Sequence, residues 1–400
     1  NGDGKPEIIL CHKASSQVTV LGNEATQGEL SAASFPNQQL YFVGDGPVCV
    51  KAGDLNGDGR PDIATANFTL GNFSVLENQH FSGLFGSSSF GVYHDYDGDL
   101  SECTSISIGQ LDNEGGLDIA VTNLNTNTVQ VFRNKYHEGV PVEDAFKPGQ
   151  ILPTGTQPQS VKMGDFDGDG RQDLAVACSE VSNPAIVLFQ NLSAPGSLLD
   201  GSFSEPVPVG LSGYLEELEV ADMNGDGRPD LITVEGAADQ VYIYPNIHTA
   251  GISLQDLNFD NRFRLFVKRL PTDLAVGDLD NDGRPDIVTS NHLHNSVSII
   301  HNNPHVTVTA SAGDHGSITP NGTFILSPFS DPEFIIETEA GYEVEEVLVN
   351  GEPVLNPALN PFILENLDGN RIIQVTFRLA CPEMIFVSAP SNSTFSVSAA

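Results

Sequence analysis

The sequence has no tryptophan and few basic residues: 17 lysines and arginines stand against 53 aspartates and glutamates, for a formal net charge of −36. An acidic excess of this size repels phosphate backbones and anionic lipid surfaces, so we expect no nucleic-acid partner. No apolar run approaches the roughly 18 residues of a membrane-spanning helix, so we expect no membrane insertion. With 39% hydrophobic and only 18% charged residues, the composition also excludes wholesale disorder.

Catalytic and redox signatures are also missing. The five cysteines have neither CxxC spacing nor a metal-type cluster, and their odd number leaves at least one unpaired within the chain. No Gly-x-Ser-x-Gly, His-Glu-x-x-His or phosphate-binding glycine loop is present. His292 and His294 lie in an expected loop, which we interpret as a solvated turn. We therefore expect that the protein is not an enzyme.

What the sequence does contain is a repeated acidic segment. The copies are 53–63, 221–231 and 277–287, a fourth at 164–174 with Gln172 at the proline position, a degraded fifth at 109–119, and a sixth at the chain start. The leading positions 54, 110, 165, 222 and 278 are 56, 55, 57 and 56 residues apart. A second marker has the same period, an asparagine that ends an alternating run: Asn23, Asn78, Asn134, Asn191, Asn246 and Asn302. Two markers with one period make chance repetition very improbable.

Each period predicts four short strands and no helix. In one period the expected strands are Val161–Gly164, Leu174–Ala177, Ala185–Gln190 (after a turn at Asn183-Pro184) and an edge strand Pro206–Val209. Small residues precede each acidic loop, which suits innermost strands that converge on an axis. Four strands per period indicate an all-β fold built from propeller blades. A solenoid is the alternative, although its repeats are usually shorter, roughly 20–50 residues.

The acidic segments form nine-residue loops whose donors suit calcium, which takes six to eight oxygens. Side-chain oxygens stand at positions 1, 3, 5 and 9, and position 7 offers its backbone carbonyl. Glycines at positions 4 and 6 permit positive-φ turns. Hairpin turns alone would not need this many carboxylates, which would repel one another without a cation. We predict four calcium sites: Asp54, Asn56, Asp58, Arg60 and Asp62; Asp165, Asp167, Asp169, Arg171 and Asp173; Asp222, Asn224, Asp226, Arg228 and Asp230; and Asp278, Asp280, Asp282, Arg284 and Asp286.

Two further loops are incomplete, and calcium binding stays open in both. One has Gln110 at position 1 and retains Asp112, Glu114 and Asp118. The other, at the chain start, retains Asn1, Asp3 and Glu7 without a leading residue. A half-site at 95–99 has Cys103 where position 9 requires an acid, and we interpret it as a solvated loop.

The pattern Asp-x-Asn/Asp-Gly-Asp-Gly-x-x-Asp-Ile/Leu, followed by Asn-x-Val-x-Val/Ile, resembles the FG-GAP/VCBS repeat family over residues 1–304. The resemblance implies an integrin-type β-propeller of four-stranded blades, with calcium between the first and second strands. It also implies seven blades in the full ring, of which six motifs are visible here. Because the first blade begins inside its acidic loop, we expect upstream residues to supply the remainder.

The composition changes after residue 304. Residues 305–380 contain alternating strands and the segments Gly-Ser-Ile-x-Pro, Ala-Gly-Tyr-x-Val and Val-x-Val-Asn-Gly. These segments resemble the small β-rich repeat modules of bacterial surface proteins, which act as stalks or spacers. Residues 381–400 indicate the start of a further β-sandwich-like module or a linker.

These features favour a calcium-stabilised adhesion or scaffold protein, with the propeller as a protein- or surface-binding platform on a modular stalk. The expected location is extracellular or on a bacterial cell surface, because extracellular calcium modules need millimolar calcium. The alternative is a calcium-dependent lectin, and less favoured is a non-catalytic part of a secreted polysaccharide-degrading enzyme. The ligand stays unidentified, and self-association stays open. Five tyrosines outside the repeat core could stack on sugars, although we favour their interpretation as ordinary half-buried loop residues: Tyr41, Tyr93, Tyr96, Tyr136 and Tyr214.

Overall fold

The chain divides into two compact units, Asn1–Asn302 and Asn303–Ala400, which we call the repeat unit and the C-terminal unit. Our predictions for the turn at 183–184 and for residues 381–400 fall outside the described residues. Within the described part of the chain, no helix is long and apolar enough to cross a membrane. The computed structural model describes residues 1–25, 34–80, 85–138, 140–180, 186–209, 213–246, 254, 259, 262–280, 282–302, 306–326, 332–354, 360–364, 367 and 370–380.

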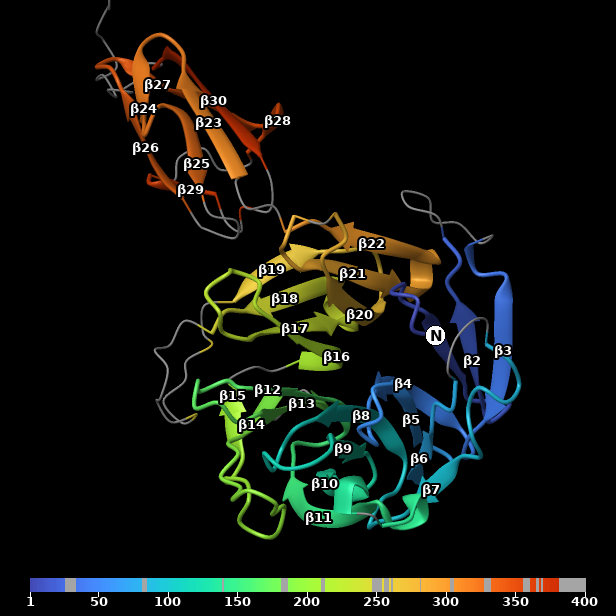
Figure 1. The fold of residues 1–400 in the computed structure, drawn as a ribbon. Helices are drawn as coiled ribbons and strands as arrows, with labels where there is room; N and C mark the ends of the chain where they lie inside the picture. Colours follow the sequence, from blue (N-terminus) through green and yellow to red (C-terminus); the bar gives the residue numbers. More distant parts are fainter. Residues whose placement is uncertain are drawn as a thin grey trace, which may run out of the picture. The chain divides into compact units, whose positions relative to one another are not determined.

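The repeat unit consists of small antiparallel sheets that follow one another around a common centre (Figure 1). Strands that are consecutive in a sheet pair antiparallel, and a short pairing of β13 with β16 joins two of the sheets. In chain order the sheets contain β1 (Ile8–His12), β2 (Gln17–Gly22) and β3 (Asn37–Phe42); β4 (Pro47–Gly53), β5 (Asp62–Asn67), β6 (Asn72–Leu76) and β7 (His94–Tyr96); β8 (Cys103–Gly109), β9 (Asp118–Asn123), β10 (Thr128–Asn134) and β11 (Phe146–Pro153); β12 (Pro158–Gly164), β13 (Asp173–Glu180), β14 (Ile186–Phe189) and β15 (Val207–Val209); β16 (Gly213–Ala221), β17 (Asp230–Glu235), β18 (Gln240–Tyr244) and β19 (Phe263–Phe266); and β20 (Pro271–Gly277), β21 (Asp286–Asn291) and β22 (Ser296–Ile300). Short 3₁₀ turns lie at Tyr136–Glu138, Val142–Asp144, Gly236–Ala238 and His292–His294.

The four strands predicted for the period at 161–209 are confirmed as β12, β13, β14 and β15. The proline-containing strand β15 lies at the edge of its sheet, where Pro208 needs no N–H for a further partner. The prediction worked because alternation and turn residues are local signals.

The innermost strands β4, β8, β12, β16 and β20 lie next to one another in chain order (Figure 1). A Cβ at Gly109, the last residue of β8, would lie 2.3 Å from Gln172 Oε1 and 2.6 Å from Met163 Sδ. A larger residue here would require the Gln172 and Met163 side chains to move, which agrees with the small residues predicted for converging strands. Gly277 at the end of β20 differs, because no atom lies within 4 Å of the position that a Cβ would take there.

The core lies between neighbouring sheets. β5 is buried along its whole length, and its side chains alternate between two neighbours. Ile63 packs with Val18 and Tyr41 of the preceding sheet, whereas Ala64 packs with Ile106 of the following one. Both faces of β5 are therefore covered by neighbouring sheets.

The C-terminal unit contains two sheets around one core that includes Val308, Phe334, Val347 and Ile373. The alternating strands expected within residues 305–380 are present, and the pairing of β23 with β30 is parallel. The sheets contain β25 (Gly322–Leu326), β23 (Val306–Ala312), β30 (Arg371–Leu379), β27 (Tyr342–Val349) and β28 (Glu352–Pro353); and β24 (Gly316–Thr319), β26 (Glu333–Thr338) and β29 (Phe362–Ile363).

Candidate metal centres

The acidic loops connect the first strand of a sheet to the second, as the loop at 54–62 does between β4 and β5. Asp54 at position 1 organises this loop: its Oδ1 accepts hydrogen bonds from the Gly57 and Asp58 amides at 2.8 and 3.1 Å, and its Oδ2 accepts one from Gly59 at 2.8 Å. Gly57 and Gly59 have φ angles of +76° and +84°. The predicted positive-φ turns are therefore present, and they direct the backbone amides at a carboxylate.

Positions 3, 5 and 7 continue around the same loop. Asn56 Oδ1 accepts from the Asp58 amide at 3.0 Å, and Asp58 Oδ1 accepts from the Arg60 amide at 2.9 Å. The Arg60 guanidinium bonds Asp58 Oδ2 through Nη2 and donates from Nε to the Asn78 carbonyl at 2.8 Å. Both partners of the Arg60–Asp58 pair are partly exposed, at 29% and 28%. Such a pair is weak, so the arginine can leave the carboxylate to another cation.

Position 9 holds a buried carboxylate at the start of the second strand. Asp62 is fully buried, and its two oxygens accept from the Leu55 amide at 3.0 Å and the Asn78 amide at 2.7 Å. Burial raises the pKa of Asp62 to about 6 and that of its counterpart Asp173 to about 8. These carboxylates are costly to keep charged without a compensating cation.

The same arrangement recurs in the other three complete loops. Position 1 accepts at least two backbone amides in each, as Asp165 does from Asp169 at 3.0 Å and Gly170 at 2.9 Å. The corresponding side chains are Asp165, Asp167, Asp169 and Asp173; Asp222, Asn224, Asp226 and Asp230; and Asp278, Asp280, Asp282 and Asp286.

In two of these loops, at 165–173 and 278–286, carboxylate oxygens converge closely enough to hold a metal ion. The ligand atoms of Asp165, Asp167 and Asp173 lie within 4.8 Å of one another, as do those of Asp278, Asp280 and Asp282. A third group joins Asp280 and Asp286 to His301. The donors are mostly carboxylate oxygens on a flexible glycine loop, which fits a hard divalent cation such as calcium.

The incomplete loop at the chain start keeps part of the pattern. Asn1 Oδ1 accepts from the Asp3 amide and Asp3 Oδ1 from the Lys5 amide, each at 2.9 Å, which are the bonds of positions 3 and 5. Glu7 stands at position 9, and its Oε1 is buried without a hydrogen-bond partner.

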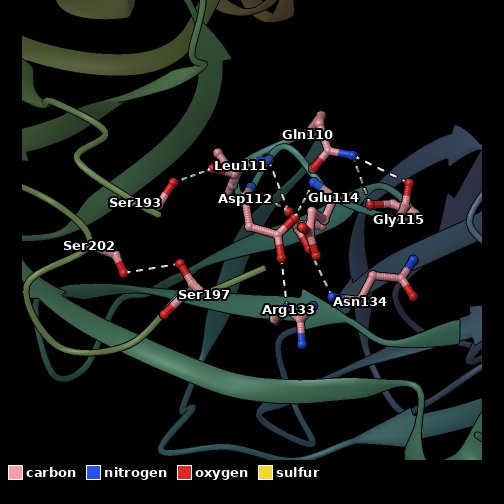
Figure 2. A network of polar contacts seen from close by, with 12 residues as sticks. Gln110, Leu111, Asp112, Glu114, Gly115, Arg133, Asn134, Ser193, Ser197 and Ser202 are labelled. Atoms are coloured by element: carbon pink, nitrogen blue, oxygen red, sulfur yellow. Dashed lines mark hydrogen bonds and ion pairs between the residues drawn. The ribbon is translucent and has the colours of Figure 1, made fainter. Parts of the chain in front are cut away.

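The incomplete loop at 110–118 has a different interior, shown in Figure 2. Asp118 keeps the role of position 9 and accepts from the Leu111 and Asn134 amides at 2.9 and 2.8 Å. At position 3, however, Asp112 Oδ2 accepts a bond from Arg133 Nε at 2.6 Å. Gln110 at position 1 points its amide group at two carbonyls of its own loop, 3.4 Å away.

In four repeats, the periodic asparagine at the end of the third strand has a function that we did not predict. Its side-chain amide donates to the position-2 carbonyl of the preceding repeat's loop, as Asn191 does to Leu111 at 2.8 Å. Asn134 bonds Leu55 in the same way at 2.8 Å, Asn246 bonds Phe166 at 2.8 Å and Asn302 bonds Met223 at 2.7 Å. Periodicity marked these residues, but their partners lie 79 or 80 residues away. The acidic loops are thus tied in a row, repeat to repeat.

Two of the tyrosines considered for sugar stacking are not accessible, and both lie on strands and not in loops. Tyr41 is buried against Phe90, and Tyr96 is buried and stacks on Phe73. Tyr214 is 47% exposed. The half-site at 95–99 exposes Asp95, Asp97 and Asp99 to solvent, as expected for a solvated segment. Asp95 lies on the edge strand β7 and also accepts a hydrogen bond from Ser74 at 2.5 Å.

A polar cavity of about 210 Å³ lies among the innermost strands, lined by residues that include Lys51, Ser107, Lys162 and Glu219. The Lys162 ammonium lies 2.9 Å from Glu217 Oε1 and 2.7 Å from Glu219 Oε1, and the two carboxylates raise its pKa against the effect of burial. The ammonium is therefore held charged in a salt-bridge network.

A family model for the FG-GAP-like repeat matches residues 1–65, 110–176 and 222–289, which together make up half of the chain. The chain therefore belongs to the FG-GAP-like repeat family, and its sheets form a β-propeller-like fold. No curated protein matches it in sequence.

Several solved structures are similar to the chain at low sequence identity. BBS1N in complex with ARL6DN, from a crystal soaked with lead, has a TM-score of 0.41 and 9% identity, with 96% of this chain and 90% of that chain covered. A functionally unknown protein from Desulfotomaculum acetoxidans has a TM-score of 0.44 and 10% identity, covering 92% and 98%. A protein from Lactobacillus plantarum has a TM-score of 0.41 and 13% identity, covering 72% and 82%.

Proposed function

We propose that the four complete acidic loops bind calcium and that the protein is a calcium-stabilised extracellular adhesion or scaffold protein. The observation that carries the proposal is the recurrence of one loop with a buried position-9 aspartate at 54–62, 165–173, 222–230 and 278–286. In the loops at 165–173 and 278–286, three carboxylates also converge closely enough to hold a metal ion. Position 1, 3, 5 and 9 side chains would hold the ion, together with the position-7 carbonyl. The ion would supply the positive charge that these buried carboxylates need.

Calcium in these loops has a structural role in this proposal. Each loop joins two strands, and the loops at 54–62, 165–173 and 222–230 are also bonded by the asparagine of the following repeat. A rigid loop therefore also fixes the contact between these repeats. With free calcium at ten times the dissociation constant, each site contributes about 1.4 kcal/mol. Four independent sites would contribute roughly 5–6 kcal/mol, comparable to the whole stability of a typical domain.

The extracellular location follows from the same affinity argument. Extracellular calcium modules bind with dissociation constants of about 10⁻⁴–10⁻³ M, so their sites fill only where free calcium is millimolar. The net charge of −36 keeps the protein away from nucleic acids and anionic membranes. The C-terminal unit, as a small β module, would act as a stalk or spacer that carries the repeat unit.

The adhesion role is tested with beads that carry the intact chain, applied to candidate cell surfaces in millimolar calcium and again in chelator. The adhesion role requires that beads are retained in calcium and released in chelator. Beads with the Asp282→Ala variant should be retained less in calcium. Beads with Asp200→Ala, which changes an exposed aspartate outside the acidic loops, should behave like the wild type. No retention on any surface from a folded, calcium-loaded chain contradicts the adhesion role and leaves the scaffold role.

A glycan array run in calcium and in chelator distinguishes the lectin alternative. Calcium-dependent binding to a defined sugar would favour the lectin function over adhesion to a protein partner. With Tyr41 and Tyr96 buried, Tyr214 is the most exposed of the five candidate tyrosines. Tyr214→Ala should then abolish the array signal. Light scattering of the intact chain tests self-association.

A further inference from the structure

The residue that precedes the terminal asparagine of each repeat faces position 3 of the acidic loop in several repeats. Gln190 Nε2 donates to Asp167 Oδ2 at 2.6 Å, and His301 Nδ1 lies 3.7 Å from Asp280 Oδ2. In the 110–118 loop this residue is Arg133, 2.6 Å from Asp112 Oδ2. In each of these repeats, the residue before the terminal asparagine therefore places its side chain against position 3 of the loop. Of the three side chains, only that of Arg133 is a permanent cation.

The Arg133–Asp112 pair is shielded from water. Asp112 has a fully buried side chain and Arg133 is 14% exposed. In three of the complete loops, by contrast, the loop arginine is about a third exposed, at 29% for Arg60, 33% for Arg171 and 31% for Arg228, and pairs with an acid two residues away. An exposed pair yields easily to a metal ion, whereas separating a buried pair leaves an uncompensated charge.

The rest of this loop is also arranged around the arginine (Figure 2). Position 1 is neutral Gln110, whose amide bonds loop carbonyls instead of accepting the loop's N–H groups as Asp54 does. The following repeat covers the loop: Ser193 Oγ donates to the Leu111 carbonyl at 2.8 Å, and the Gly196 amide donates to the Asp112 carbonyl at 3.0 Å. The donor set expected for calcium is therefore incomplete and partly occupied.

We propose that the Arg133 guanidinium takes the place of calcium in the 110–118 loop, so that this repeat carries its own cation and is closed to the metal. The inference rests on the proposed calcium binding of the four complete loops. A divalent ion beside Asp112 would be repelled by the guanidinium, which cannot lose its proton. One loop of the row therefore stays ordered whether or not calcium is present.

The test counts calcium ions per chain by native mass spectrometry in three proteins. The first is the wild type. The second carries Gln110→Asp and Glu114→Asp, which restores the acids of positions 1 and 5 but keeps Arg133. The third adds Arg133→Gln, so that positions 1, 3, 5 and 9 and the residue facing position 3 have the same side chains as in the 165–173 loop with Gln190. We expect the first two proteins to bind the same number of ions and the third to bind one more.

An extra ion in the second protein, or none gained in the third, overturns the inference. Asp282→Ala serves as the control for the complete loops, because it should lower the count by one. A wild type that binds no calcium contradicts the proposed function and not the arginine assignment.

Hydrogen exchange of the wild type in chelator gives an independent result that does not depend on the folding of a variant. The backbone of β8 and β9 should keep its protection when that of β4 and β5 loses it. Equal loss of protection in both pairs of strands overturns the inference.

Discussion

Replacing Asp282 by alanine removes the position-5 carboxylate of the 278–286 loop and leaves the fold around it nearly unchanged. The side chain is exposed, and its Oδ1 accepts a hydrogen bond from the Arg284 amide at 2.9 Å. In chelator the change should therefore stay within about 0.5 kcal/mol, as for other surface substitutions. In calcium it should also remove the contribution of one bound ion.

The magnitude follows from mass action. At free calcium ten times the dissociation constant, one site contributes about 1.4 kcal/mol to the free energy of unfolding. In a unit of this size, 1 kcal/mol corresponds to roughly 2 °C in Tm. We therefore expect Asp282→Ala to lower Tm by about 3 °C in calcium and by less than about 1 °C in excess chelator.

Differential scanning calorimetry of both proteins in both conditions checks this expectation. Asp200→Ala is the matched control, because it removes the same charge from an exposed position outside the loops. Equal Tm losses for Asp282→Ala in calcium and chelator would refute the reasoning, since the carboxylate would then act without a metal.

Three further outcomes are expected. Asn191→Ala removes a side-chain amide that donates to the Leu111 and Gln172 carbonyls at 2.8 Å each. The variant should lower the free energy of unfolding of the repeat unit by about 2 kcal/mol in urea denaturation, in calcium and in chelator alike. A loss confined to calcium would contradict the role of this bond between repeats. Lys162→Met leaves the Glu217 and Glu219 carboxylates without their shared ammonium and should lower the free energy of unfolding by about 3 kcal/mol in the same assay. Adding Glu217→Gln to this variant should restore a part of that loss. An unchanged stability of Lys162→Met would mean that the network is solvated. Without a bound cation, burial raises the pKa of Asp173 to about 8 from an ordinary 3.8, so its contribution to stability is fully present below pH 3.8 and is lost as the pH rises through 8. Calcium offsets the charge of the ionised form, so the Tm gain from calcium should grow between about pH 5 and 8, and a gain independent of pH would contradict this.

The strands and acidic loops were predictable because their signals are local. Alternation of apolar residues placed β12 to β15, and the spacing of Asp, Asn and Gly placed the turns at Gly57 and Gly59. Each signal depends on residues within about one turn or strand, where sequence order and spatial order coincide.

The contacts between repeats could not be predicted in this way. Asn134 is visible in the sequence as a periodic residue, but its bond to Leu55 spans 79 positions. Arg133 lies on β10 and contacts Asp112 in the loop between β8 and β9, 21 positions away. The corresponding residues in other repeats are of unrelated types. Only the register of β10 against β9 brings the two together.

The burial of Tyr41 and Tyr96 has a similar cause. Tyr41 lies on β3, and its hydroxyl donates to the Gly86 carbonyl at 2.6 Å, 45 positions away. Tyr96 packs between Phe73 and Phe146, the latter on β11 of the following sheet. Both residues stand outside the repeated motif, yet the segments that cover them come from elsewhere in the chain.

The most direct test of the central claim is an anomalous difference map from crystals of the protein grown in millimolar calcium. We predict a peak between the carboxylates of each complete loop, at 54–62, 165–173, 222–230 and 278–286, and none at 110–118, where Arg133 should remain on Asp112. Loops that show only water or their own arginine side chains at full calcium concentration would contradict the account.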